Sequence, residues 1–231
     1  MAKLLLVRHG QASYGQLDYD RLSPRGEAQA RALGAILARE APNAIFVGPH
    51  VRQQQTAALA REAAPALPEP APLDGLAEYP GFELARAFLP RLAAEDPELA
   101  RMATTPNRAL ASRFFHTALA KWSLDEWHAD GVERVGEFRT RVEAALTQAI
   151  ASAPSGGTIC CVTSAGPIGV AAGLVFGASA HHMISASAVI RNASISELKL
   201  RTREFAWRPD KVSLVGFNST AHLSPDLVTE Y

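Results

Sequence analysis

Three consecutive residues near the start of the chain have the types and spacing for phosphoryl chemistry. Arg8, His9 and Gly10 follow residues 3–7, a short and largely apolar run that predicts a buried strand. Neutral imidazole is a good nucleophile near pH 7 and can attack phosphorus, provided that its other ring nitrogen is held as N–H. A guanidinium group offers phosphoryl oxygens a fixed fork of donors, and glycine lets the backbone approach a phosphate closely. The triplet is compatible with a phosphate site in which His9 is the nucleophile, but three residues alone are a weak signal. The alternative is a structural histidine.

A second arginine lies at a predicted helix start. Arg52 follows a short buried strand at residues 44–47 and a break at Gly48, and a helix is expected over residues 50–64. A cation at this position opposes the helix dipole unless an anion is bound beside it. The position of Arg52 therefore argues against an unpaired cation and for a bound anion beside it. The alternative is an ordinary cation on the helix surface.

Ser164 follows another apolar run and has more than one interpretation. It lies between a predicted strand over residues 158–163 and a predicted helix that ends near Phe176. Its hydroxyl could donate one hydrogen bond to a phosphoryl oxygen, and the helix start adds backbone N–H groups. The hydroxyl could instead be only the N-cap of that helix.

A further interpretation makes the chain a serine hydrolase. Ser164 occupies a strand-to-helix turn like that of a nucleophile elbow, and Asp210 and His222 follow in the chain order of a hydrolase triad. However, Val162 replaces the first glycine of the elbow. The interpretation also gives no role to the arginines and the histidine that follow the first two strands.

The elements that must position these side chains are short strands alternating with helices. Strands are expected at residues 3–7, 44–47, 158–163, 194–200 and 212–217, and helices from Ser23-Pro24 onward, over 50–64 and 133–151, and after Ser164. This alternation predicts an α/β fold, a three-layer sandwich with a mostly parallel central sheet flanked by helices. Ligand sites form outside the carboxyl ends of such strands, so the turns at residues 8–10, 48–52 and 163–166 should open on one edge.

The middle of the chain is less regular. Residues 65–72 are rich in proline and predict an extended connector, and residues 73–78 could form a short strand. Residues 83–127 have a mostly helical pattern with breaks at Pro90, Pro97 and Pro106, which we interpret as a helical insert over the site. We therefore expect residues 1–231 to form a single domain that carries this insert.

Composition excludes several classes of partner. The 23 Lys and Arg residues balance 23 Asp and Glu residues, so we expect no nucleic-acid or anionic-membrane surface. Residues 144–190 contain no charged side chain, but glycines and prolines interrupt every apolar run before the roughly 18 residues that a membrane span needs. Because the spacings of metal ligands and of nucleotide-binding glycine loops are missing, we expect neither metal nor cofactor.

Two features favour a cytoplasmic location. Cys160 and Cys161 are adjacent, and neighbouring side chains of a strand point to opposite faces, so we expect two buried, reduced thiols. At the amino end, the apolar residues 4–7 are too few for the core of a secretory signal.

Several ordered segments resemble the histidine phosphatase (phosphoglycerate mutase-like) superfamily. They are the opening signature at residues 4–13 (LLLVRHGQAS), the first helix start at 22–30 (LSPRGEAQA), the second-arginine segment at 47–57 (VGPHVRQQQTA), the general-acid segment at 76–78 with 81–83, and a late strand entry at 192–195. The resemblance runs from the first strand to about residue 200 and is weakest across the insert. The order of the motifs makes it more specific than any one of them.

The resemblance implies a role for each candidate residue. His9 would be the nucleophile, and Arg8 and Arg52 would bind the phosphoryl group. Glu78 would protonate the leaving oxygen, which requires burial to raise the pKa of its carboxyl, and Glu83 is the second candidate for this acid. The implied reaction is hydrolysis of a small phosphomonoester through a phosphohistidine intermediate, without metal or cofactor. A mutase is less expected because no segment for holding a bisphosphoglycerate is recognisable, and a homodimer is compatible with the sequence.

Ser164 departs from the family pattern, which normally has a second histidine after this strand. Serine cannot carry a positive charge, so the predicted phosphate pocket is one cation short. The histidines that folding could bring into the gap are His50, His181, His182 and His222. An asparagine often found shortly after the first motif is also missing. The alternative function is therefore a phosphate-binding regulatory module with weak or lost catalysis.

Overall fold

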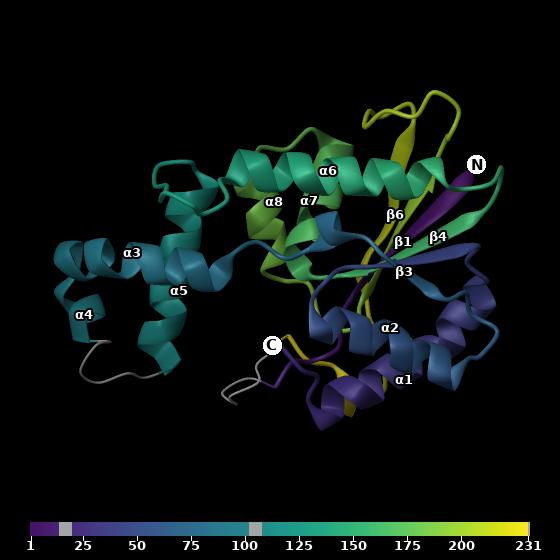
Figure 1. Ribbon diagram of the computed structural model, residues 1–231, viewed down its shortest axis with the longest axis horizontal. Helices are drawn as coiled ribbons and strands as arrows, with labels where there is room; N and C mark the ends of the chain where they lie inside the picture. The colour runs from purple at the N-terminus through teal and green to yellow at the C-terminus, as the bar shows by residue number, and fades with distance from the viewer. Residues whose placement is uncertain (14–19, 102–107, 231) are drawn as a thin grey trace. The chain divides into compact units, whose positions relative to one another are not determined.

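The central element of the structure is a twisted sheet that combines parallel and antiparallel pairing. The structure, a computed structural model, describes residues 1–13, 20–101 and 108–230 (Figure 1). Within these residues the strand order is β3-β2-β4-β1-β5-β6. The strands are β1 (Ala2–Arg8), β2 (Ala44–Val47), β3 (Pro70–Pro72), β4 (Thr158–Thr163), β5 (Ile195–Leu200) and β6 (Val212–Ser219). The first four strands pair in parallel and β5 and β6 pair antiparallel, which confirms the mostly parallel sheet.

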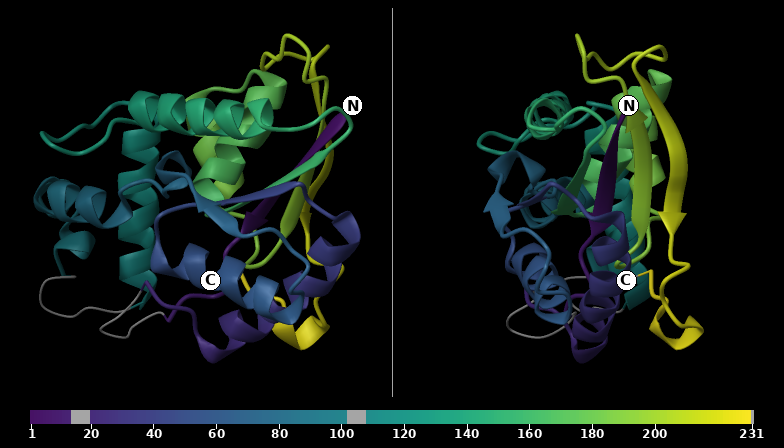
Figure 2. Two further views of the ribbon diagram at one scale, coloured as in Figure 1. Left: turned by 45° about the vertical axis from the view of Figure 1, so that its right-hand side comes forward. Right: turned by 90° about the vertical axis from the view of Figure 1, so that its right-hand side faces the viewer.

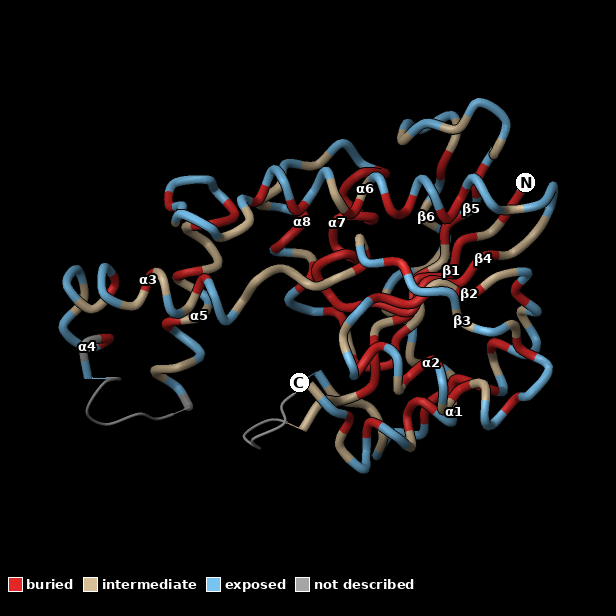
Figure 3. Tube along the Cα trace, viewed as in Figure 1, coloured by how far each residue is buried: buried red, intermediate tan, exposed pale blue. Residues whose placement is uncertain are grey.

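Helices cover both faces of this sheet. One face carries α1 (Pro24–Glu40) and α2 (Val51–Ala63), and the other carries α7 (Ala165–Phe176), α8 (Ala180–Ser187) and the part of α6 (Val135–Ala151) from residue 141 onward (Figures 1 and 2). Leu5 and Val7 of β1 pack in the hydrophobic cluster formed with α1 and α2. The intervening Leu4 and Leu6 are equally buried, as both faces are covered (Figure 3). The three-layer α/β sandwich is therefore confirmed.

The start of α1 shows how local sequence positions the first polar turn. Ser23 is the N-cap, its side chain accepts a hydrogen bond from the Gly26 N–H at 3.1 Å, and Pro24 occupies the first helical position. A Cβ atom at Gly10 would lie 2.4 Å from the Gly26 carbonyl oxygen. The turn after β1 therefore packs directly on the first turn of α1, and only glycine allows this approach.

One expectation for the chain between β2 and the insert is wrong in detail. The strand is Pro70–Pro72 rather than residues 73–78, and a 3₁₀ turn, η1 (Asp74–Leu76), follows it. Proline is tolerated in β3 because β3 is an edge strand with a single neighbour. The chain then turns because the Leu76 N–H donates to the Leu73 carbonyl at 3.0 Å. The helix α8 was not expected from the sequence.

Residues 79–140 form a compact unit of their own, and residues 1–78 with 141–231 form the other. The first contains α3 (Gly81–Glu95), α4 (Pro97–Ala100) and α5 (Arg108–Ser123), around a core in which the Trp122 ring lies 5.8 Å from that of Tyr79 and 5.9 Å from that of Phe138. The expected break at Pro97 is confirmed, since it begins α4. The expected break at Pro90 is wrong, because α3 continues through it, and Pro106 lies outside the described residues. The single-domain interpretation and the placement of the insert stay predictions.

No helix in the described part of the chain combines the length and the apolar character that crossing a bilayer requires.

Candidate active site

Three polar turns meet at one edge of the sheet, as expected. In the parallel register, Arg8 is opposite Thr163 and Val47 is opposite Val162, so β1, β2 and β4 end side by side. The His9 N–H donates to the Thr163 carbonyl at 2.9 Å, and the Gly48 N–H donates to the Val162 carbonyl at 3.1 Å. The convergence of the turns at residues 8–10, 48–52 and 163–166 is thus confirmed.

His9 is oriented for nucleophilic attack through one ring nitrogen. Its Nδ1 lies 2.7 Å from the carbonyl oxygen of Gly10, which can only accept, so Nδ1 carries the proton. Its Nε2 accepts a hydrogen bond from Nε of Arg52 at 3.0 Å and therefore has a lone pair. Burial and the charges of Arg52 and Arg8 hold the pKa of His9 well below its usual range. The imidazole is consequently neutral near pH 7, the form that attacks phosphorus.

Arg52 lies in the first turn of α2 and is nearly buried, with 8% of its surface exposed. One side of its guanidinium contacts His9, and Nη1 at the other side donates to the carboxylate of Asp20. Thr56 fixes the same turn to the nucleophile, because its hydroxyl donates to the Arg52 carbonyl at 2.7 Å and accepts from the Gly10 N–H at 3.0 Å. Arg52 is therefore a preorganised cation beside His9 rather than a surface charge.

Arg8 also lies close enough to influence His9, but its guanidinium contacts the backbone. Nη1 donates to the carbonyl of Ile190, and to that of Glu230 at 3.0 Å. The segment before Glu230 is itself held by Gln29, whose Nε2 donates to the Leu227 carbonyl at 2.6 Å. Phosphate binding by Arg8 stays a prediction.

Glu78 lies at the start of α7. Its carboxylate oxygens accept from the Gly166 N–H at 3.0 and 3.2 Å, and its own N–H donates to Nε2 of His50 at 3.2 Å. The helix N-terminus favours the ionised carboxylate, and Glu78 is only half-buried, so the burial expected for a proton-donating acid is not found. Glu83, the second candidate acid, belongs to α3 in the other compact unit. Glu78 is thus the candidate acid that shares a unit with His9.

Ser164 is enclosed rather than exposed to a ligand. Its side chain has no measurable exposure and accepts a hydrogen bond from Nε2 of Gln53 at 2.8 Å. Ser164 is the N-cap residue of α7, as the alternative interpretation expected, but its side chain does not make the capping hydrogen bond. A phosphoryl group could reach the hydroxyl only after a rearrangement, so phosphate binding by Ser164 stays a prediction.

The sequence reasoning missed Gln53, which is fully buried between two of the three turns. Its Oε1 accepts from the His50 N–H at 3.1 Å, and its Nε2 also lies 3.3 Å from the Leu76 carbonyl. These contacts set the orientation of the amide, which presents its NH₂ group to Ser164. The only sequence signal was its place one residue after Arg52, on the same helix turn.

Asp20 was also missed. Its carboxylate accepts from the Val51 N–H at 2.9 Å and from Nη1 of Arg52, and it lies 4.0 Å from Nδ1 of His50. The sequence indicated that a cation at this helix start needs an anion, and within the described residues the chain supplies one itself.

The serine hydrolase interpretation is not supported by the arrangement of its proposed triad. β5 runs antiparallel to β1, so the connection from β5 to β6 leaves the sheet at the edge opposite His9. Asp210 lies in this connection, where it forms an ion pair with Arg208 at 2.8 Å. Ser164 and Asp210 are therefore at opposite ends of the sheet.

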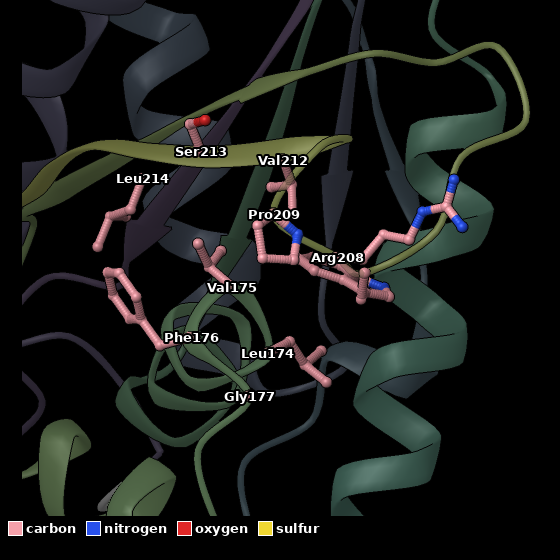
Figure 4. Close-up of a pocket in the computed structure, with 10 residues that line it drawn as sticks. Leu174, Val175, Phe176, Gly177, Arg208, Pro209, Val212, Ser213 and Leu214 are labelled. Carbon is pink, nitrogen blue, oxygen red and sulfur yellow. The ribbon is translucent and has the colours of Figure 1, made fainter.

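A pocket of about 530 Å³ lies at that opposite end (Figure 4). It is formed by the last turn of α7 and the start of β6, with Leu174, Phe176 and Leu214 in its wall. The labelled polar side chains are Arg208 and Ser213. They do not form an arrangement like that of His9 with its neighbouring arginines. The pocket is separate from the candidate active site.

Comparison with known proteins identifies the family of the chain. The model of the histidine phosphatase superfamily (branch 1) matches residues 4–101 and 98–209. The chain belongs to this superfamily. No curated protein has significant sequence similarity to it.

Solved structures with the same fold are numerous, and all those described next are distant in sequence. A mycobacterial glucosyl-3-phosphoglycerate phosphatase in complex with inorganic phosphate is 21% identical, with a TM-score of 0.66, covering 96% of this chain and 99% of that one. An Entamoeba histolytica phosphoserine phosphatase mutant in complex with phosphoserine is 18% identical, with a TM-score of 0.62, covering 97% and 100%. A putative α-ribazole-5′-phosphate phosphatase from Escherichia coli is 18% identical, with a TM-score of 0.63, covering 95% and 98%. These similarities show that the chain shares the fold of these proteins.

Proposed function

We propose that this histidine phosphatase hydrolyses small phosphomonoesters through a phosphohistidine on His9. The observation that carries the proposal is the state of the His9 ring, with Nδ1 facing a carbonyl at 2.7 Å and Nε2 facing Nε of Arg52 at 3.0 Å. A neutral nitrogen nucleophile beside a fixed guanidinium is the arrangement that phosphoryl transfer needs. The solved relatives named as phosphatases support the same reaction class.

In the first step, Nε2 of His9 forms a bond to phosphorus while the bond from phosphorus to the ester oxygen breaks. Glu78, in its protonated form, donates its proton to the leaving alkoxide, so an alcohol departs. In the second step, water attacks phosphorus and gives a proton to the Glu78 carboxylate, and the phosphorus–nitrogen bond breaks. Inorganic phosphate leaves, and His9 and Glu78 return to their starting states.

The positive charge that stabilises this transfer comes from side chains, so the proposed reaction needs no metal ion. Arg52 is already hydrogen-bonded to the attacking nitrogen and can bind an equatorial oxygen of the phosphoryl group as it arrives. Arg8 adds a second charge close to His9, which is evident from its effect on the pKa of His9. We retain Ser164 as a proposed phosphate contact that requires its hydroxyl to become accessible.

Rapid-quench labelling tests the proposal directly. Mixing the protein with a ³²P-labelled phosphomonoester should give acid-labile label on the protein within one turnover. His9→Ala should abolish this label, and Asp210→Asn, at the far edge of the sheet, should leave it unchanged. Label that persists in His9→Ala would contradict a phosphohistidine at this residue.

A second function, a phosphate-binding regulatory module, is favoured by one observation. The resemblance places Ser164 where the family's second histidine is expected, and its hydroxyl is enclosed and bound to Gln53. A serine cannot supply the positive charge of a histidine at this position, which lowers the expected stabilisation of the transition state. Assays with p-nitrophenyl phosphate across pH 4–8 separate the two functions. Phosphate binding without hydrolysis would favour the module.

A further inference from the structure

The candidate phosphate site already contains an anion that belongs to the chain. Asp20 places one carboxylate oxygen on Nη1 of Arg52 and the other 2.9 Å from the Val51 N–H, the first amide of α2. The ion pair is partly enclosed, with 10% of the Arg52 side chain and 35% of the Asp20 side chain exposed. Nδ1 of His50 lies 4.0 Å from the same carboxylate.

The donors that hold Asp20 are those that a phosphoryl group would use. A guanidinium fork and the N–H groups of a helix start are common partners of phosphate oxygens. The same guanidinium joins the carboxylate to the nucleophile, because its Nε donates to His9 while its Nη1 donates to Asp20. A phosphoryl group placed for attack by His9 and bound through Nη1 of Arg52 would therefore compete with the Asp20 carboxylate for that donor.

We propose that Asp20 is an internal competitor, whose carboxylate occupies the phosphoryl-binding donors of Arg52 and Val51 until a phosphorylated ligand displaces it. The inference rests on the proposed function only in taking His9 and Arg52 as the phosphate site. It predicts that removing the charge of Asp20 strengthens the binding of inorganic phosphate. If Asp20 only oriented Arg52, its removal would weaken that binding.

The test measures the dissociation constant of inorganic phosphate by isothermal titration calorimetry, with the full chain at constant ionic strength. Asp20→Asn keeps the shape of the side chain and removes its charge, whereas Asp20→Ala removes both. Both variants should bind phosphate at least about ten-fold more tightly than the unchanged protein, since ligands no longer displace a bound carboxylate. Asp210→Asn makes the same change in net charge at the opposite edge of the sheet, and should leave the affinity within about two-fold.

Unchanged or weaker phosphate binding in both Asp20 variants would overturn the inference, and so would equal tightening in Asp210→Asn. These measurements need no turnover, so they are independent of the labelling experiment. Tighter binding in a protein that forms no label on His9 would support the competitor while contradicting the phosphatase. Label on His9 together with unchanged phosphate affinity in both Asp20 variants would support the phosphatase while contradicting the competitor.

Discussion

The two helix starts at the edge of the sheet that carries His9 follow parallel strands in the same way but differ in charge and exposure. Each follows a parallel strand, α2 after β2 and α7 after β4, and each has a carboxylate of the chain on a backbone N–H of its first turn. The start of α2 has a charged donor, Arg52, which retains some exposure. At the start of α7 the uncharged Ser164 accepts a hydrogen bond from Gln53 of α2, and neither side chain has measurable exposure.

This difference separates two tasks that a phosphatase must perform. Positive charge and access are concentrated at α2, so this helix start is expected to bind and stabilise the phosphoryl group. At the start of α7, Gln53 covers Ser164, and the Gly166 N–H donates to Glu78. This helix start is therefore expected to position the acid and to add little to phosphate affinity. The contrast predicts that substitutions at the two starts have different kinetic signatures.

The largest effect is expected for Glu78→Gln with a substrate whose leaving group is a poor one. Loss of a general acid typically costs about 10²–10⁴-fold in rate, so kcat for an alkyl phosphate should fall by that factor. With p-nitrophenyl phosphate the loss should be less than about ten-fold, because its leaving group needs no proton. Glu83→Gln is the matched control and should retain activity on both substrates. A larger loss for Glu83→Gln would assign the acid to the other unit.

Arg52→Ala should lower kcat/KM by about 10²–10³-fold, the usual cost of removing one donor to a transition-state anion. It should also move the acidic limb of the pH–rate profile upward, because Arg52 contributes to the lowered pKa of His9. Ser164→Ala should cost less than about ten-fold if its hydroxyl stays enclosed. Equal losses in the two variants would remove the contrast between the helix starts.

Gln53→Ala should affect stability more than catalysis. It leaves the Ser164 hydroxyl and the His50 N–H without their present partner and opens a cavity, so urea unfolding should show a loss of about 2–4 kcal/mol. The adjacent Gln54 is exposed, and Gln54→Ala should change the free energy of unfolding by less than about 0.5 kcal/mol. Similar values for the two variants would show that the hydrogen bond from Gln53 to Ser164 does not stabilise the fold.

The smallest effect is a dependence of stability on pH below neutrality. Burial lowers the pKa of both His9 and His222 in the folded protein, so on acidification the unfolded chain binds protons first. Their contribution is therefore fully present above about pH 6.5 and is lost as the pH falls below that value. The thermal midpoint should be lower at pH 5 than at pH 7.5, and His9→Gln should reduce the difference. A midpoint that does not change would contradict the neutral, buried state of His9.

The parts of the fold that the sequence predicts well are those determined by local patterns. The strands around His9 and Ser164 are short buried runs, and Ser23-Pro24 marks the start of α1 by its capping chemistry alone. Pro90 was misjudged because tertiary packing within its unit retains the helix despite the missing N–H.

The missed site residues depend on contacts that no local pattern specifies. Asp20 meets the start of α2 from 31 residues away. Gln53, Gln54 and Gln55 are identical in type, and only the orientation of α2 decides that the first is buried while the second is exposed. The resemblance marked Ser164 as a departure from the family pattern, but its enclosure depends on Gln53 and was not evident from its own neighbours in the sequence.

The two adjacent free thiols of β4 have a practical consequence for experiments on this enzyme. Cys160 and Cys161 are the two cysteines of the chain, both fully buried, and burial raises the pKa of Cys160 to about 12 and that of Cys161 well above its usual value. Maleimide reagents need an accessible thiolate, so the native protein should resist them. A cysteine introduced at the exposed Asp74 would then be the single reactive thiol, and a fluorophore or spin label could be attached there without removing either native residue.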